Sequence, residues 1–183
     1  MLLIAVCGLA GAGKTTCLDI LERLGEGAKV YVGSFVTAEV ARRSLPATPQ
    51  NERLVREELR ASGGMAAVAQ LAFPTISGIL DAGRVALIDA IYCKEEYEFY
   101  LGRCSGRIIR IAVETAKPER EHRLAARALR PIDAGELNKR DEFELTRLGL
   151  ADVIGTAEHK ISNDGSLADL ERTLQRLVGS LRL

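Results

Sequence analysis

Hydrophobic residues gather in five short runs along the chain. Three of these runs are almost continuously apolar, which is typical of strands in a parallel sheet that is covered on both faces. The other two are shorter or more polar. The pattern predicts strands at residues 2–7, 29–32, 85–89, 108–113 and 159–162.

Between these runs, apolar residues recur every three or four positions, as they do on one face of an amphipathic helix. Helices are predicted at residues 15–24, 36–43, 52–61, 65–80, 94–101, 118–129, 137–148 and 167–181. Strands that alternate with helices predict a three-layer α/β/α fold around a parallel sheet. No linker divides the sequence, so residues 1–183 are interpreted as one domain.

Two segments interrupt this alternation. About fifty residues of mainly helical pattern separate the second and third predicted strands, and a simple crossover is much shorter. We therefore expect a helical insert at about residues 34–82. Between the fourth and fifth strands, residues 130–135 (RPIDAG) join two helices through a turn-rich hinge, which predicts a movable lid at about residues 117–147.

Residues 8–15 (GLAGAGKT) fit the phosphate-binding pattern G-x-x-x-x-G-K-[ST], directly after a predicted strand and before a predicted helix. The glycines permit positive φ angles and let backbone N–H groups surround a phosphate. We expect Lys14 to bridge the β- and γ-phosphates, Thr15 to coordinate Mg²⁺, and Thr16 to donate near the α-phosphate. The predicted nucleotide-binding residues of this loop are Gly8, Gly11, Ala12, Gly13, Lys14, Thr15 and Thr16.

Asp89 ends the third predicted strand. Open α/β sheets bind ligands at the carboxyl edge, so Asp89 is predicted to hold Mg²⁺ together with Thr15, directly or through water. The alternative is a helix-capping role, since aspartate is a common N-cap.

Arginines recur at helical spacing in the first predicted lid helix. They fall within an arc of roughly 80° on a helix of 3.6 residues per turn. Like charges stacked in this way destabilise an isolated helix, so the stripe indicates contacts with a phosphate or nucleotide. The alternative is a solvated face with local ion pairs. The stripe consists of Arg120, Arg123, Arg127 and Arg130.

Composition narrows the range of partners. Lysine plus arginine and aspartate plus glutamate each number 25, the aromatic content is 4 %, and tryptophan is absent, so we expect no nucleic-acid partner. No apolar run approaches the roughly 20 residues of a membrane helix, so no membrane partner is expected either. The four cysteines form no C-x-x-C pair, and reduced thiols in a cytoplasmic protein are the simplest interpretation.

The phosphate loop, the insert, the paired lid helices with spaced arginines and the ending at residues 161–167 (ISNDGSL) together resemble the nucleoside monophosphate kinase group of P-loop kinases. Within this group the chain is most similar to the dephospho-coenzyme A kinases and to a largely archaeal set of nucleotide-kinase-like proteins. The resemblance implies a five-stranded parallel sheet of order 2-3-1-4-5, with ATP and Mg²⁺ as the donor pair. It also implies that the insert holds the acceptor and that lid arginines reach the transferring phosphoryl group.

The resemblance assigns roles to further residues. Arg123 and Arg127 take the positions of lid arginines that flank the adenine and phosphates, and Arg140 takes that of the arginine on the returning helix. Asn163 falls in the loop expected beside the adenine. The predicted catalytic residues are Lys14, Asp89, Arg127 and Arg140.

The acceptor side departs from the pattern of these kinases. Many of them carry an aspartate shortly after the second strand, whereas here no carboxylate follows Ser34 until Glu39. Tyr92 stands where an arginine commonly clamps the acceptor phosphate. Arg42 and Arg43 are candidate replacements, with a surface role as the alternative.

The leading hypothesis is therefore an ATP-dependent kinase that phosphorylates a nucleotide-like small molecule, either a nucleoside monophosphate or dephospho-coenzyme A. The altered acceptor side favours a second hypothesis, an ATP-binding regulatory protein with weak or no kinase activity. A GTPase is disfavoured because the N-K-x-D pattern at residues 138–141 follows no apolar strand. The sequence leaves the acceptor, the choice between ATP and GTP, and the oligomeric state open.

Overall fold

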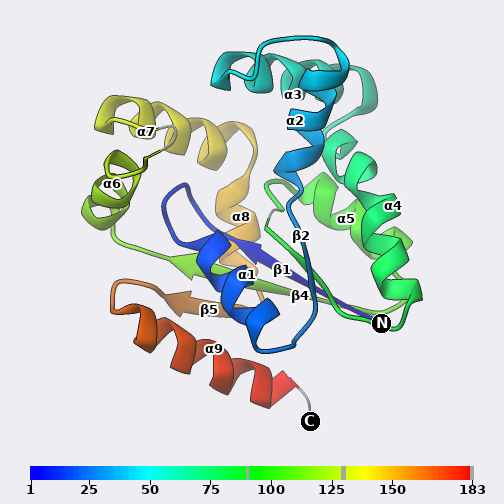
Figure 1. Ribbon diagram of the computed structural model, residues 1–183, viewed down its shortest axis with the longest axis vertical. Helices are drawn as coiled ribbons and strands as arrows, with labels where there is room; N and C mark the ends of the chain where they lie inside the picture. Colours follow the sequence, from blue (N-terminus) through cyan, green and yellow to red (C-terminus); the bar gives the residue numbers. More distant parts are fainter. Residues whose placement is uncertain (90, 129–130, 182–183) are drawn as a thin grey trace.

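The computed structural model describes residues 1–89, 91–128 and 131–181, and its centre is a five-stranded parallel sheet (Figure 1). The strand order is β2-β3-β1-β4-β5, which confirms the predicted topology. β1 lies in the middle, with Ile4 opposite Leu87 on one side and Ile109 on the other. The strands are β1 (Leu2–Cys7), β2 (Ala28–Val30), β3 (Ala86–Ile88), β4 (Arg107–Glu114) and β5 (His159–Ser162).

Helices cover both faces of the sheet, because alternate residues of each strand point to opposite sides. On β1, Leu3 and Ala5 belong to one buried cluster, and Ile4 and Val6 belong to the other. Figure 1 shows α1 and α9 lying together on one face. The helices packed on the sheet are α1 (Lys14–Arg23) and α9 (Leu167–Leu181) on one face, with α4 (Ala67–Asp81), α5 (Lys94–Arg103) and α8 (Leu150–Gly155) on the other.

The predicted insert folds as α2 (Gly33–Arg42), α3 (Pro49–Gly63) and α4. Thr48 caps α3 by accepting the Asn51 N–H at 3.2 Å, and Pro49 occupies the first turn, where it loses no helical hydrogen bond. Gly64, with φ 80°, then separates α3 from α4. A role for this segment in acceptor binding stays a prediction.

The predicted lid contains α6 (Lys117–Ala125), α7 (Ala134–Glu142) and a π-helical turn, η1 (Phe143–Arg147). Asp133 caps α7 by accepting the Glu136 N–H at 2.8 Å. α6 is shorter than predicted because the Leu124 carbonyl accepts the Ile132 N–H at 3.3 Å, so the chain turns back after Ala125. Residues 129 and 130, which belong to the predicted helix and hinge, lie outside the described residues.

The short helix α8 was not predicted. It follows Gly149, which has φ 74°, and buries Leu150 and Val153 in the cluster beneath the sheet. A helix of six residues is too short to show a recognisable helical periodicity in the sequence, so α8 could not be distinguished from the segment around it.

Within the described residues, no single helix has the length and apolar character needed to span a membrane. α3 and α4 satisfy these criteria only when taken together, and they are bent by 91° relative to each other.

Candidate active site

The phosphate loop connects β1 to α1 at the carboxyl edge of the sheet. Gly8 and Gly13 have φ angles of 146° and 99°. A Cβ atom on Gly8 would lie 2.5 Å from the Val113 carbonyl oxygen, and one on Gly13 would lie 2.2 Å from Nδ2 of Asn163. Only glycine fits so close to both neighbours. α1 begins without a side-chain cap, so its first N–H groups are available to an anion.

Lys14 turns back onto this loop. Its ammonium donates to the carbonyl oxygens of Gly8 at 2.7 Å and Leu9 at 3.0 Å, and it lies 5.9 Å from the centre of the Tyr92 ring. Burial lowers the pKa of Lys14 from 10.5 to about 8. A desolvated cation that donates its hydrogen bonds to neutral carbonyl oxygens is well suited to a phosphate, whose charge offsets the cost of burial.

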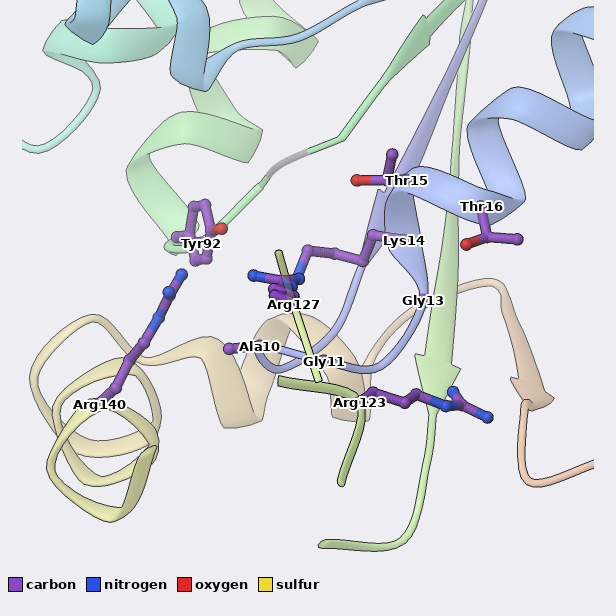
Figure 2. A pocket seen from close by; sticks show the side chains of 10 residues that line it. All are labelled: Ala10, Gly11, Gly13, Lys14, Thr15, Thr16, Tyr92, Arg123, Arg127 and Arg140. Carbon is purple, nitrogen blue, oxygen red and sulfur yellow. The ribbon is translucent and has the colours of Figure 1, made fainter. Parts of the chain in front are cut away.

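A cavity of about 340 Å³ lies in front of the loop, where the loop, α1, the segment after β3 and the lid meet (Figure 2). Its lining residues are Ala10, Gly11, Gly13, Lys14, Thr15, Thr16, Tyr92, Arg123, Arg127 and Arg140. The structure thus brings together eight of the twelve predicted site residues. The other four, which lie outside this lining, are Gly8, Ala12, Asp89 and Asn163.

The lid arginines differ in direction. Arg140 points toward Tyr92, whereas Arg123 points away from both (Figure 2). Arg123 donates to Glu119 at 2.9 Å and to the Asn163 carbonyl at 2.8 Å, so its guanidinium is already occupied. The Arg127 side chain makes no hydrogen bond or ion pair with the described residues. Arg127 therefore offers the freest charge of the three to a ligand in the cavity.

A buried carboxylate on η1 supports Arg140. Glu144 is 6 % exposed, and its Oε1 accepts the Arg140 Nε–H at 2.7 Å, while its Oε2 has no partner. Burial, followed by the charge of Glu144, raises the pKa of Tyr92 to about 12, so this phenol stays protonated at neutral pH. Glu144 was not among the site residues predicted from the sequence. Its position four residues after Arg140 was the available signal.

Arg120 does not join the other lid arginines, which corrects the prediction that the whole stripe meets an anion. It is 4 % exposed and pairs with Asp141 through two hydrogen bonds of 3.0 and 2.7 Å. A further hydrogen bond of 3.1 Å reaches the Ala10 carbonyl. Asp141, on α7, neutralises this arginine, so Arg120 ties the two lid helices to the phosphate loop. Arg130, the last member of the stripe, lies outside the described residues.

Asp89 follows β3 and bridges to the insert. Its Oδ1 accepts the Val32 N–H, at the start of α2, with a length of 2.8 Å. Burial raises the pKa of Asp89, which marks a desolvated carboxylate that a cation would stabilise. No cluster of three or more acidic, histidine or cysteine ligands occurs among the described residues. Thr15 and Asp89 therefore fit Mg²⁺ that takes its other ligands from phosphates and water.

Arg42 and Arg43 are not directed at the cavity. Arg42 donates two hydrogen bonds to Glu39, at 2.6 and 2.7 Å, and Arg43 pairs with Glu39 at 2.8 Å and with Glu58. Of the two interpretations of these arginines, the structure favours the surface role.

Comparisons with known proteins agree with this architecture. Residues 4–144 match the family described as AAA domain. Similar proteins include the UPF0200 protein of Aeropyrum pernix, which is 34 % identical over 96 % of this chain and 91 % of its own length. The UPF0200 protein of Thermococcus gammatolerans is 32 % identical over 97 % of this chain and 94 % of its own length.

Solved structures with low sequence identity share the fold. Shikimate kinase from Bacteroides thetaiotaomicron has a TM-score of 0.63 at 18 % identity, covering 100 % of this chain and 99 % of its own. A gluconokinase from Sinorhizobium meliloti has a TM-score of 0.56 at 15 % identity, and the match covers 98 % of this chain and 94 % of the gluconokinase. The strand order, the phosphate loop and these likenesses confirm the P-loop kinase-like group. The chain belongs to the UPF0200 proteins and has the fold of a P-loop kinase.

Proposed function

We propose that this protein is an ATP-dependent kinase that transfers the γ-phosphoryl group to a nucleotide-like small molecule, either a nucleoside monophosphate or dephospho-coenzyme A. The observation that carries the proposal is the meeting of Lys14, Arg127 and Arg140 at one cavity beside the uncapped start of α1. Three cations and a set of free backbone N–H groups at one place match the charge of a triphosphate.

Each group has a defined task in this proposal. Lys14 and the loop N–H groups hold the β- and γ-phosphates, and Arg127 and Arg140 stabilise the charge that develops on the transferring group. An acceptor oxygen forms a bond to the γ-phosphorus as the bond to the β–γ bridging oxygen breaks, and ADP leaves. Thr15 and Asp89 would hold Mg²⁺, which neutralises phosphate charge when bound. Catalysis then depends on positioning more than on a strong base.

Arginines of the insert favour an acceptor that carries negative charge. Glu96 accepts the Tyr92 N–H at 2.7 Å and pairs with Arg60 of α3 at 3.4 Å, which places this helix beside Tyr92. Arg56 lies one turn before Arg60 on α3, and Glu52 lies one turn before Arg56. Burial, with Arg60 and Arg140 nearby, lowers the pKa of Arg56. An acceptor that carries a phosphate would neutralise this charge, and both proposed acceptors carry one.

The test is ADP formation from ATP and Mg²⁺ with a panel of nucleoside monophosphates, the matching nucleosides and dephospho-coenzyme A. We expect at least one phosphorylated acceptor to stimulate ADP formation, and no nucleoside to do so. The Lys14→Ala variant should reduce the stimulated rate at least a hundredfold, because it removes a contact to the transferring group. A wild-type rate that no acceptor raises would refute the kinase.

An ATP-binding regulatory protein is the second candidate. It is favoured by Tyr92 at the clamp position and by the absence of a carboxylate between Ser34 and Glu39. The same assay separates the two candidates. ATP binding without any acceptor-dependent ADP supports the regulator, whereas stimulated turnover excludes it.

A further inference from the structure

One carbonyl of the phosphate loop is held by side chains from two other strands. The Ala12 oxygen accepts a hydrogen bond from Nδ2 of Asn163 at 2.9 Å and another from Oγ1 of Thr115 at 3.1 Å. Thr115 follows β4 and Asn163 follows β5, so both donors come from the half of the sheet beyond β1. Asn163 is 7 % exposed, which makes its amide a fixed part of the interior.

These two hydrogen bonds determine where the next N–H group points. In a trans peptide the C=O and the following N–H lie on opposite sides of the plane. Fixing the Ala12 oxygen against Asn163 and Thr115 therefore turns the Gly13 N–H the other way, toward the cavity that Gly13 lines. Glycine reaches positive and negative φ with similar ease, so the loop itself does not impose this orientation.

The position of the Asn163 amide is itself determined by its neighbours. The backbone of Asn163 is held on both sides. Its N–H donates to the Glu114 carbonyl at 2.8 Å, and its carbonyl oxygen accepts from the Arg123 side chain at 2.8 Å. A side chain at residue 13 would collide with Nδ2, since a Cβ atom there would lie 2.2 Å away. Gly13 and Asn163 thus depend on each other: the missing Cβ leaves the space in which the amide reaches the loop.

We propose that Asn163 is a positioning residue for the polyphosphate of the nucleotide. Together with Thr115, it fixes the Ala12–Gly13 peptide so that the Gly13 N–H faces the anion. This inference rests on the proposed function, because it concerns the same phosphate site. It differs from the adenine-side role that the sequence resemblance implied for Asn163, because the residue acts here on the phosphates and through the loop backbone.

The test compares the affinities of the wild-type protein and Asn163→Ala for tripolyphosphate and for ATP, both with Mg²⁺, by titration calorimetry. Tripolyphosphate has no base, so it reports on the phosphate site alone. We expect Asn163→Ala to weaken both ligands by the same factor, about tenfold, which is typical for the loss of one positioned hydrogen bond. Asn51→Ala is the matched control, since its amide also donates to a carbonyl, that of Pro46 at 2.8 Å, at the start of α3.

Variants of Thr115 test the inference independently of how well Asn163→Ala folds. Thr115→Val keeps the shape of the side chain and removes the donor, and it should weaken tripolyphosphate about threefold. Thr115→Ser keeps the donor and should restore the wild-type affinity. A role limited to stability would lower the melting temperature of Thr115→Val and leave the affinity of the folded protein unchanged, which would overturn the inference.

Two further outcomes separate this inference from the proposed function. If Asn163→Ala weakens ATP but not tripolyphosphate, Asn163 contacts the base and the positioning role is wrong. If neither affinity changes while the wild-type protein shows acceptor-dependent ADP formation, the positioning role alone is wrong. If the wild-type protein binds neither ligand, both proposals fail.

Discussion

The phosphate loop and the elements that surround it, the insert and the lid, are held in place by different kinds of interaction. The loop is fixed by its backbone geometry and by hydrogen bonds to its carbonyls. The donors are neutral side chains at Ala12 and the cations Lys14 and Arg120 at the carbonyls before it. The insert and the lid depend on ion pairs between side chains, with Arg60 paired to Glu96 and Arg140 paired to Glu144. The first kind of arrangement requires particular residues at fixed spacing. The second requires only that charges balance when the parts meet.

Buried polar atoms show the same contrast. Among the described residues, four buried side-chain atoms lack a hydrogen-bond partner, and none belongs to the phosphate loop. They lie in the lid, the insert and α5, and they are Arg60 Nε, Tyr100 Oη, Arg120 Nε and Glu144 Oε2. Because an unpaired buried polar atom is costly, these three elements are where a ligand or a lid movement has most to gain. The loop is organised in advance, and its surroundings are not.

The largest effect is expected where the lid joins the loop. Asp141→Ala removes the only carboxylate paired with the buried Arg120 in the described part of the chain. An uncompensated buried charge costs about 3–5 kcal/mol, so the free energy of unfolding in urea should fall by that amount. Glu57→Ala breaks the exposed pair with Arg53 and should change it by less than about 0.5 kcal/mol. Equal losses in the two variants would show that the lid and the loop are not coupled by charge.

Asp89 links the loop side to the insert, and its replacement should affect turnover more than stability. Asp89→Asn keeps an oxygen that accepts the Val32 N–H, so α2 should start as before. The carboxylate charge, which would hold Mg²⁺, is lost, and kcat should fall about a hundredfold. Initial rates at several Mg²⁺ concentrations give the measurement. An unchanged kcat would refute the metal role and leave Asp89 only as the acceptor of the Val32 N–H that precedes α2.

The contrast also explains how much the sequence could predict. The phosphate loop and the five parallel strands followed from patterns in which each residue type has a local physical reason, whereas the strand order followed from the resemblance to P-loop kinases. The ion pair of Arg120 with Asp141 could not be predicted in this way. The helical spacing of Arg120 suits an anion-binding stripe, and only the folded chain shows that Asp141 from the next helix already neutralises it.

Glu144 and Arg56 were missed for a related reason. Neither belongs to a motif. Glu144 gains its importance from its burial beside Arg140, and Arg56 from its burial near Tyr92 and Arg140, which lie far away in sequence. Asn163 was predicted from the resemblance to lie beside the adenine, whereas its contact with the Ala12 carbonyl, which joins residues 151 positions apart, was not predicted. Long-range contacts of this kind depend on the sheet order and on exact loop paths, which periodicity does not specify.

A smaller effect is expected at Arg56, and it should fall on one substrate only. Arg56→Ala should raise the KM of the phosphorylated acceptor about tenfold, because a charge-assisted contact to the anion is lost, and leave the KM of ATP unchanged. Arg53→Ala, on the same helix but paired with Glu57 and exposed, is the control and should change neither value. The measurement is steady-state kinetics with both substrates varied. A shift in the KM of ATP would contradict the prediction and place Arg56 on the donor side.

The smallest effect concerns the protonation of Lys14. Its pKa of about 8 in the empty site lies below 10.5, so the unfolded chain binds more protons than the folded one between these values. The free energy of unfolding of the empty protein should therefore rise with pH across this interval, and the rise should be absent in Lys14→Met.

Phosphate binding should show the opposite trend, because it requires the charged form of Lys14. As the pH rises from 7 to 8.5, Lys14 becomes neutral in a growing fraction of the empty protein, and the affinity for tripolyphosphate should fall about fourfold. Lys14→Arg keeps its charge throughout this range and should remove the dependence, whatever its own affinity. A wild-type affinity that stays constant up to pH 8.5 would mean that Lys14 keeps an ordinary pKa. The loop would then pay no desolvation cost for the cation it presents to the phosphates.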